Sequence, residues 1–141
     1  HTLLQGLDVR KTYHALVFGG PEGDAGVVDA PIARRPLPSL LRYVAPEGKP
    51  SVTEYTVLEK FDGYTKLALR PVTGRTHQLR VHCDHMGFPI LGDPQYASER
   101  SMRFSEQFGL QYQQLCAKRL EFTHPMTGEE MCLESDMDVK I

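Results

Sequence analysis

Three arginines and two histidines lie within the thirteen residues 70–82, a high density of groups that could do chemistry. The sequence of this segment is Arg-Pro-Val-Thr-Gly-Arg-Thr-His-Gln-Leu-Arg-Val-His. Guanidinium and imidazole groups donate hydrogen bonds to phosphate and carboxylate oxygens. The segment therefore predicts an anion or nucleic-acid site.

Two of these arginines have both a chemical and a purely structural interpretation. Arg75 lies where a helix is expected to begin, and free backbone N–H groups there would help it to form a phosphate cradle. The alternative is that Thr73 or Thr76 only caps the helix. Arg80 lies four residues before Asp84, so its alternative role is an exposed ion pair worth roughly a few tenths of a kcal/mol.

Other polar residues have similarly divided interpretations. His77 and His82 could be general acids or bases, but no Ser or Cys nucleophile is spaced to form a triad, so partly buried, hydrogen-bonded roles are the alternative. Tyr13 follows Lys11 in a predicted strand, where it is either a packing residue or an aromatic platform for a nucleobase. Farther along, Asp93 is predicted to accept backbone N–H bonds in a turn, with a core aromatic at position 96.

The elements that must position these residues follow from hydrophobic periodicity and turn signals. Strands are predicted at 11–18, 51–61, 64–70, 120–123 and 131–133, with hairpin turns at Asp62-Gly63 and 124–128. Residues 19–50 are rich in Gly and Pro and predict an excursion with small strands, and residues 2–8 resemble the end of a helix. The predicted class is α+β, with a mixed, mostly antiparallel sheet and few helices.

Two helices complete the predicted elements. The first begins within the segment 70–82 and ends at Gly87. Its core-facing residues would be Thr76, Leu79, Cys83 and Met86, and its neighbouring chemical face would carry His77, Arg80, Val81 and Asp84. The second helix is expected at 101–108.

Composition limits the classes of function. The chain has 141 residues, about one domain, and a formal net charge of −2, so its basic character is local. Its three cysteines show no metal-ligand spacing and suggest small buried side chains in a reducing compartment. The sequence has no leader pattern and no apolar run of about 18 residues. We expect a soluble, cytoplasmic protein without a metal or membrane contact.

Taken together, the motifs resemble those of the RluA-type pseudouridine synthases, and of their short, single-domain branch in particular. The resemblance runs from about Leu4 to Leu133. The matching strings are Lys11-x-Tyr13-x-Ala15, Thr53-Glu-Tyr55, the whole segment 70–82, Gly87-x-Pro-Ile-x-Gly-Asp93-x-x-Tyr96 and Leu120-x-Phe-x-His-Pro-x-Thr-Gly128.

The resemblance implies isomerisation of uridine to pseudouridine in structured ribosomal or transfer RNA, with the target base flipped out of its stack. It implies that Tyr13 stacks on the base and helps to remove the proton from its C5, and that Arg80 pairs with a catalytic aspartate and keeps it ionised. Lys11, Arg75 and His77 would contact the RNA. No metal, nucleotide or organic cofactor is implied.

One family motif is missing from this sequence. The catalytic aspartate of the family lies in a His-Arg-Leu-Asp-x-x-Thr-Ser-Gly string upstream of the Lys-x-Tyr motif, and no such string occurs here. Asp8 lacks its context and is not assigned that role. We therefore expect residues 1–141 to form the C-terminal portion of a single catalytic domain, inactive alone, with an incomplete sheet that another chain could cover.

Two other functions remain open from the sequence. A non-catalytic RNA-binding module with the same fold would lack the aspartate motif in its native reading frame. A phosphate-binding metabolic enzyme that uses Arg75 would bind mononucleotides or sugar phosphates without RNA, but it leaves the other motifs unexplained.

Overall fold

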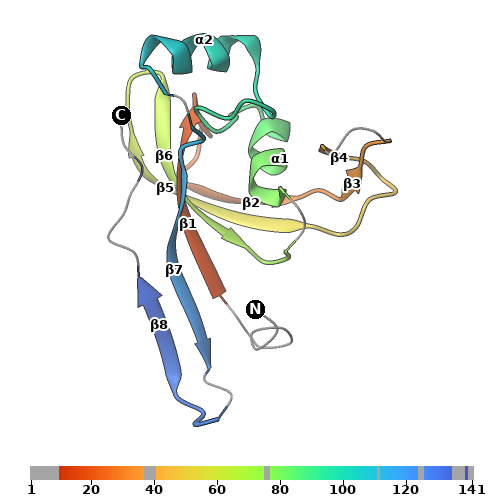
Figure 1. The fold of residues 1–141 in the computed structure, drawn as a ribbon, viewed down its shortest axis with the longest axis vertical. Helices are drawn as coiled ribbons and strands as arrows, with labels where there is room; N and C mark the ends of the chain where they lie inside the picture. Colours follow the sequence, from red (N-terminus) through yellow and green to blue (C-terminus); the bar gives the residue numbers. More distant parts are fainter. Residues whose placement is uncertain are drawn as a thin grey trace.

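A computed structural model of the chain describes residues 10–36, 41–74, 77–110, 112–123, 126–134 and 139. Six strands form one antiparallel sheet (Figure 1). In spatial order they are β2 (Ala25–Asp29), β5 (Val52–Lys60), β6 (Tyr64–Pro71), β1 (Arg10–Phe18), β7 (Leu115–Thr123) and β8 (Glu130–Glu134). A second, two-stranded sheet pairs β3 (Ile32–Arg34) with β4 (Arg42–Val44). The helices are α1 (Gln78–His85) and α2 (Glu99–Gln107). The predicted α+β class and its mostly antiparallel sheet are confirmed.

The hairpin of β5 and β6 forms at the predicted turn. Gly63 has φ 86°, a left-handed conformation that glycine adopts without steric cost, so the chain can reverse directly after Asp62. A register shift between Val57 and Glu59 bends β5. On its other side β6 pairs with β1, which places the strand that carries Tyr13 in the middle of the sheet.

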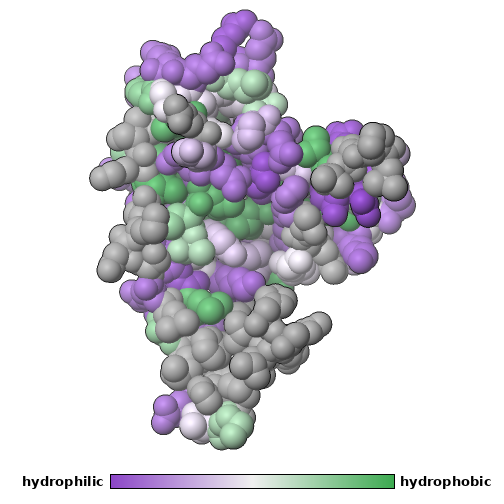
Figure 2. Space-filling view, in the orientation of Figure 1, coloured by the Kyte–Doolittle hydropathy of each residue, from purple (hydrophilic) through white to green (hydrophobic). Residues whose placement is uncertain are grey.

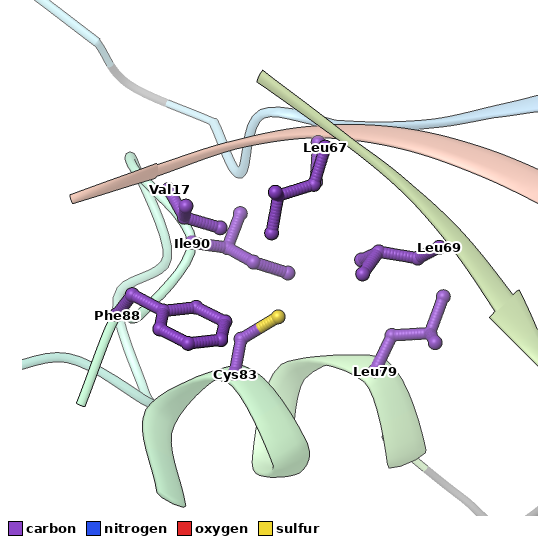
Figure 3. Close-up of a cluster of buried hydrophobic side chains, with 8 residues drawn as sticks. Val17, Leu67, Leu69, Leu79, Cys83, Phe88 and Ile90 are labelled. Atoms are coloured by element: carbon purple, nitrogen blue, oxygen red, sulfur yellow. The ribbon is translucent and has the colours of Figure 1, made fainter. Parts of the chain in front are cut away.

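The main core lies between the sheet and α1 (Figure 3). Its buried members are Ala15 and Val17 of β1, Leu67 and Leu69 of β6, Leu79 and Cys83 of α1, and Phe88 and Ile90 of the following loop. The predicted core roles of Leu79 and Cys83 are confirmed. Successive strand residues point to opposite faces, so Leu16 packs on the other side of the sheet with Leu91.

Helix α1 differs in detail from the prediction. Its N-cap is His77, which has φ 57°, so the helix begins at Gln78. Thr76, which was predicted to face the core, lies outside the described residues. Met86 was predicted to face the core, but it is the C-cap residue and its exposed fraction is 44%. Val81 was predicted on the chemical face and is instead buried, because the hairpin of β3 and β4 covers that side of the helix.

The small hairpin of β3 and β4 docks beside α1 (Figure 1). Ile32, Val81 and Tyr96 form the buried contact, with Leu41 and Val44 packed around them. Helix α1 thus separates two apolar layers, which fixes the position of its polar residues. The predicted excursion with small strands between residues 19 and 50 is confirmed.

Helix α2 begins at Glu99, two residues before the predicted start. Ser98 and Ser101 form a reciprocal capping box, in which each side chain accepts a hydrogen bond from the other residue's backbone N–H. The second position of this motif is normally Glu or Gln, which explains why the start was missed. Phe104 packs this helix against Tyr64 and Phe18 at the turn end of the sheet.

The C-terminal hairpin is confirmed, although β7 begins at Leu115, five residues earlier than predicted. All three cysteines are free, but Cys83 is buried whereas Cys132 is exposed, so the prediction of buried cysteines fails for Cys132. Among the described helices, none has the length and apolar character that a membrane span requires. The predicted helix end at residues 2–8 lies outside the described residues.

Candidate active site

Arg80, the third residue of α1, is held by a carboxylate from the loop that follows the helix. Its Nε donates to Oδ2 of Asp93 at 2.8 Å, and its Nη2 donates to Oδ1 at 2.8 Å. Nη2 also donates to Oε1 of Gln95 at 2.8 Å, and the guanidinium carbon lies 4.9 Å from the ring centroid of Tyr96. These contacts fix both the plane and the orientation of the guanidinium group.

Asp93 is the buried anchor of this arrangement. Its side chain is 0% exposed, and its Oδ1 accepts the backbone N–H groups of Gln95 at 2.9 Å and Tyr96 at 3.1 Å. The turn predicted at Asp93 and the buried aromatic predicted at Tyr96 are both confirmed. The preceding Gly92 has φ 76°, and a Cβ there would lie 2.0 Å from a backbone oxygen. Only glycine therefore lets the chain deliver Asp93 to Arg80.

The charges of the pair stabilise each other. Burial raises the pKa of Asp93, but the hydrogen bonds from Arg80 and from the two backbone N–H groups outweigh it, so the pKa lies below 3.8. The hydrogen bond to Asp93 raises the pKa of Arg80 above its usual value. Both groups are therefore charged throughout the physiological range of pH.

The structure corrects one interpretation of Arg80 and leaves another untested. Arg80 forms its ion pair with Asp93 and not with Asp84, so the exposed pair at i,i+4 is wrong. Within the described part of the chain, no acceptor contacts Nη1 of Arg80, and its two N–H groups can still bind an anion. The pairing of Arg80 with a catalytic aspartate stays a prediction.

His77 lies at the start of α1, beside the same tyrosine. Its Nδ1 is 2.8 Å from the hydroxyl of Tyr96, and that hydroxyl accepts the backbone N–H of Arg42 at 2.9 Å. Burial and the charges of Arg80 and Arg42 lower the pKa of His77, which favours the neutral ring at pH 7, and Nδ1 of this ring is hydrogen-bonded to the tyrosine hydroxyl. A non-glycine residue at φ 57° is strained, and such strain is concentrated at functional sites.

A buried polar network fastens α1 to β5. The side-chain amide of Gln78 donates to the carbonyl of Val52 at 2.8 Å and to the hydroxyl of Thr53 at 2.9 Å. The Nε2 of His82 donates to the carbonyl of Ala30 at 2.9 Å, so its Nδ1 accepts from Thr53 at 2.8 Å. His82 is thus the neutral, hydrogen-bonded residue of the structural interpretation.

Tyr13 lies at an irregularity in the middle of the sheet. The register of β1 against β7 shifts between Thr12 and Tyr13, and such bulges redirect side chains. A pocket of about 320 Å³ opens there, lined by Lys11, Tyr13, Ala117, Lys118, Arg119, Leu120 and Glu134. Tyr13 also packs against the core cluster that contains Leu79, the neighbour of Arg80. The structure therefore brings Lys11 together with Tyr13, and it brings His77 together with Arg80 through their shared contact with Tyr96.

The family is decided by comparison with known proteins. A family model described as RNA pseudouridylate synthase matches residues 1–85. The chain belongs to the RNA pseudouridylate synthase family. This confirms the resemblance that the motifs indicated.

Relatives and solved structures of this family agree with the assignment. The chain is 38% identical over 133 residues to the ribosomal large subunit pseudouridine synthase C of Vibrio cholerae, covering 94% of this chain and 42% of the relative. It is 44% identical over 136 residues to the ribosomal large subunit pseudouridine synthase D of Nitrosomonas europaea, covering 95% and 39%. The structure of human RNA pseudouridylate synthase domain containing 1 has a TM-score of 0.76 at 29% identity, covering 92% of this chain and 55% of that one. The chain thus spans about two fifths of the length of these curated relatives.

The structure does not describe every predicted site residue, and it adds two residues that the sequence analysis did not assign to the site. Arg75 lies outside the described residues, so its predicted RNA contact stays a prediction. The roles of Asp93 and Gln95 as partners of Arg80 were missed from the sequence, although the Gly-Asp-Pro turn was a usable signal for a buried carboxylate. Among the described residues, no group of three potential ligands could hold a metal ion.

Proposed function

We propose that this chain forms the C-terminal portion of the catalytic domain of an RNA pseudouridine synthase that isomerises specific uridines in structured RNA. The observation that carries the proposal is the geometry of Arg80, the arginine of the family motif. Its Nε and Nη2 bind Asp93, and its Nη1 has no acceptor among the residues that the structure describes. An arginine fixed in this way is preorganised to receive a second anion.

In the proposed reaction, that second anion is the catalytic aspartate, which this sequence does not contain. The glycosidic bond from N1 of the uracil to the ribose is broken, the base rotates, and its C5 is joined to the ribose instead. The attraction of Arg80 keeps the aspartate ionised in a site that must exclude water. Tyr13 stacks on the flipped base and helps to remove the proton from C5, a role supported by its place in an open pocket at a bulge of β1.

The residues proposed to contact RNA flank these two. Lys11 is exposed and lines the pocket of Tyr13, where it would meet the negative backbone of the flipped nucleotide. His77 is neutral and half-buried, which suits a hydrogen bond to the RNA at the rim of the site better than attraction to phosphate. Arg75 is proposed for the backbone on its family position alone.

The RNA is proposed to be ribosomal, with transfer RNA as the alternative. Support for ribosomal RNA comes from relatives whose names specify the large ribosomal subunit. We also propose that the protein works in the cytoplasm and needs no cofactor. A non-catalytic RNA-binding module is the second candidate function, and the observation that favours it is the absence of the aspartate motif from these 141 residues.

The decisive experiment uses the polypeptide of the complete native reading frame. The purified protein is incubated with ribosomal and transfer RNA, and pseudouridine is measured by mass spectrometry of the nucleosides. We expect pseudouridine in one RNA class, a loss of about 100-fold or more in Arg80→Ala, and no product from the 141-residue chain alone.

Arg103→Ala is the matched control, because Arg103 lies on α2 in an exposed pair with Glu99 and should leave turnover unchanged. Circular dichroism and RNA-binding measurements on Arg80→Ala separate lost chemistry from lost folding. Near-normal turnover in a folded Arg80→Ala protein would refute the role of Arg80. Binding of RNA without product by the complete wild-type protein would favour the non-catalytic module.

A further inference from the structure

Four hydrogen bonds join Thr73, Gln78 and the start of β5, and we call them the Gln78 clamp. The hydroxyl of Thr73 donates to Oε1 of Gln78 at 2.6 Å and accepts the backbone N–H of Val52 at 3.0 Å. The side-chain nitrogen of Gln78 donates to the carbonyl of Val52 at 2.8 Å and to the hydroxyl of Thr53 at 2.9 Å. Because Gln78 directly follows His77, the clamp holds the chain on the helix side of this histidine.

The orientation of the Gln78 amide follows from its partners. The carbonyl of Val52 can only accept, so the amide nitrogen must face it and the amide oxygen must face Thr73. Gln78 is 3% exposed and Thr53 is 1% exposed, so water has little access to these bonds. Among the described residues, no fully buried side-chain nitrogen or oxygen lacks a hydrogen-bond partner. The loss of one hydroxyl from the clamp would therefore leave a polar group unsatisfied.

His77 needs support of this kind, because its backbone is strained. Its φ of 57° lies in the left-handed region, which residues other than glycine rarely adopt. A strained residue keeps its conformation only where the surrounding structure over-determines it. The Nδ1 of His77 lies 2.8 Å from the hydroxyl of Tyr96, and its carbonyl accepts the N–H of Val81 at 2.9 Å. The clamp fixes the next residue, Gln78, and thereby adds a further constraint.

The imidazole of His77 has one nitrogen with which it can contact RNA. The residue is half-buried, and within the described part of the chain no group contacts its Nε2. The hydroxyl of Tyr96, which binds the other nitrogen, accepts the backbone N–H of Arg42 in β4. In Figure 2, strongly hydrophilic residues gather on the lobe that β3 and β4 form. The ring of His77 is thus joined through Tyr96 to a polar part of the surface.

We propose that Thr73 and Gln78 are positioning residues, whose clamp keeps His77 in the left-handed conformation in which its imidazole contacts the RNA. The inference rests on the proposed function, because it assigns the support of an RNA contact proposed there. Without the clamp, His77 relaxes towards the right-handed region that residues with a Cβ prefer, and its ring leaves the hydroxyl of Tyr96.

This role predicts a change in KM and not in kcat. Arg80 keeps its two hydrogen bonds to Asp93 whether or not the clamp is intact. In the complete protein, Thr73→Val removes the hydroxyl and keeps the shape of the side chain. It should raise the KM for RNA about tenfold, which corresponds to one lost hydrogen bond, and leave kcat within about twofold of wild type. Pseudouridine formed at a series of RNA concentrations measures both constants.

Two further threonine variants make the result specific. Thr73→Ser keeps the hydroxyl and should restore the KM of wild type. Thr65→Val removes a hydroxyl that donates to the carbonyl of Gly19 at 2.6 Å, at the opposite end of β6. It should lower the urea midpoint and leave the KM unchanged. A loss of stability alone therefore does not imitate the expected result.

A double-mutant cycle with His77→Gly decides whether the clamp acts through His77. Glycine adopts φ 57° without steric cost, so this variant keeps the start of α1 and loses the imidazole. His77→Gly should itself raise the KM, and Thr73→Val should then add less than about twofold. Equal effects of Thr73→Val in both backgrounds, or a wild-type KM in either single variant, would overturn the proposal. If Thr73→Val does not fold, Thr73→Ala replaces it, because the freed space admits water to the N–H of Val52.

The same variants separate this inference from the proposed function. If the complete wild-type protein makes no pseudouridine, the dissociation constant for ribosomal RNA, measured by fluorescence anisotropy, takes the place of the KM. Coupled losses of affinity in a protein without product would support the clamp and reject the enzymatic proposal. Independent losses in an active protein would reject the clamp alone, and independent losses in an inactive protein would reject both.

Discussion

Replacing Asp93 by asparagine keeps the shape of the side chain and removes its charge. The carboxylate is fully buried and accepts four hydrogen bonds, two from Arg80 and two from backbone N–H groups. The amide group of asparagine can replace only one oxygen as an acceptor, and its NH₂ group would face an N–H donor. The side chain of Arg80 is only 12% exposed, so its charge would lose its partner inside the protein.

The expected cost follows from the burial of that charge. Removing one partner of a buried ion pair destabilises a protein by about 3 to 5 kcal/mol, because the remaining charge is uncompensated. Gln95 and the ring of Tyr96 still contact the guanidinium in Asp93→Asn, which places the expected loss near the lower limit, about 3 kcal/mol. Urea unfolding of the complete protein, followed by circular dichroism, measures this difference.

The dependence on pH gives a second readout. The pKa of Asp93 is lower in the folded protein than its usual 3.8. Its stabilising contribution is therefore complete above pH 3.8 and is lost as the pH falls from there through the lowered pKa of the folded state. Asp93→Asn should lack this part of the acid destabilisation, while Asp84→Asn should retain it.

Two comparisons can refute this reasoning. Asp84→Asn is the matched control on the same helix, and because burial followed by repulsion from Asp93 raises the pKa of Asp84, its neutral analogue should cost little. The double variant Arg80→Met/Asp93→Leu should be less destabilised than Asp93→Asn, because it leaves no unpaired charge. A loss below about 1 kcal/mol in Asp93→Asn, or a double variant that is the less stable of the two, would show that the pair is not an interdependent buried unit.

Three further predictions concern residues around this pair. Gly92→Ala should destabilise the protein by more than about 1 kcal/mol, because the added Cβ would clash with the backbone oxygen of Tyr112 and because φ at this position is 76°. Urea unfolding tests this prediction, and a midpoint equal to that of wild type would contradict it. Tyr96→Phe should cost about 1 to 3 kcal/mol by leaving the N–H of Arg42 without its acceptor, and a melting temperature at the wild-type value would speak against that. Burial lowers the pKa of His82 below 6.5, so stability should fall as the pH drops below 6.5, and replacement of His82 by Gln should flatten this part of the profile.

The sequence predicted features whose cause is local. Asp62-Gly63 marks a hairpin because the turn residues and the alternating strands lie next to each other in the chain. The core positions of Leu79 and Cys83 follow from helical spacing. The start of α1 was less accessible, because the left-handed conformation of His77 has no signal in its residue type.

The partners of Arg80 could not be predicted in the same way. Helical spacing suggests Asp84 as the partner of Arg80. The observed partner is Asp93, which lies thirteen residues after Arg80 and is brought back to the helix by the turn at Gly92. The pairing of Arg34 with Arg42 across β3 and β4 also depends on a register that the Gly- and Pro-rich sequence does not specify. Contacts of this kind arise from tertiary structure and require coordinates.

The geometry around Arg80 explains why this position requires arginine and not merely a positive charge. A guanidinium group has five N–H donors in a fixed plane, so Asp93 can hold one edge while Nη1 has no acceptor within the described part of the chain. The ammonium group of a lysine has three N–H donors on one nitrogen and no separate edges, so a carboxylate bound to it would not fix the direction of the remaining donors. Asp93 and Tyr96 therefore fix the direction of the Arg80 side chain before a second anion binds. Because the side chain is already ordered, binding carries little further entropic cost from immobilising it.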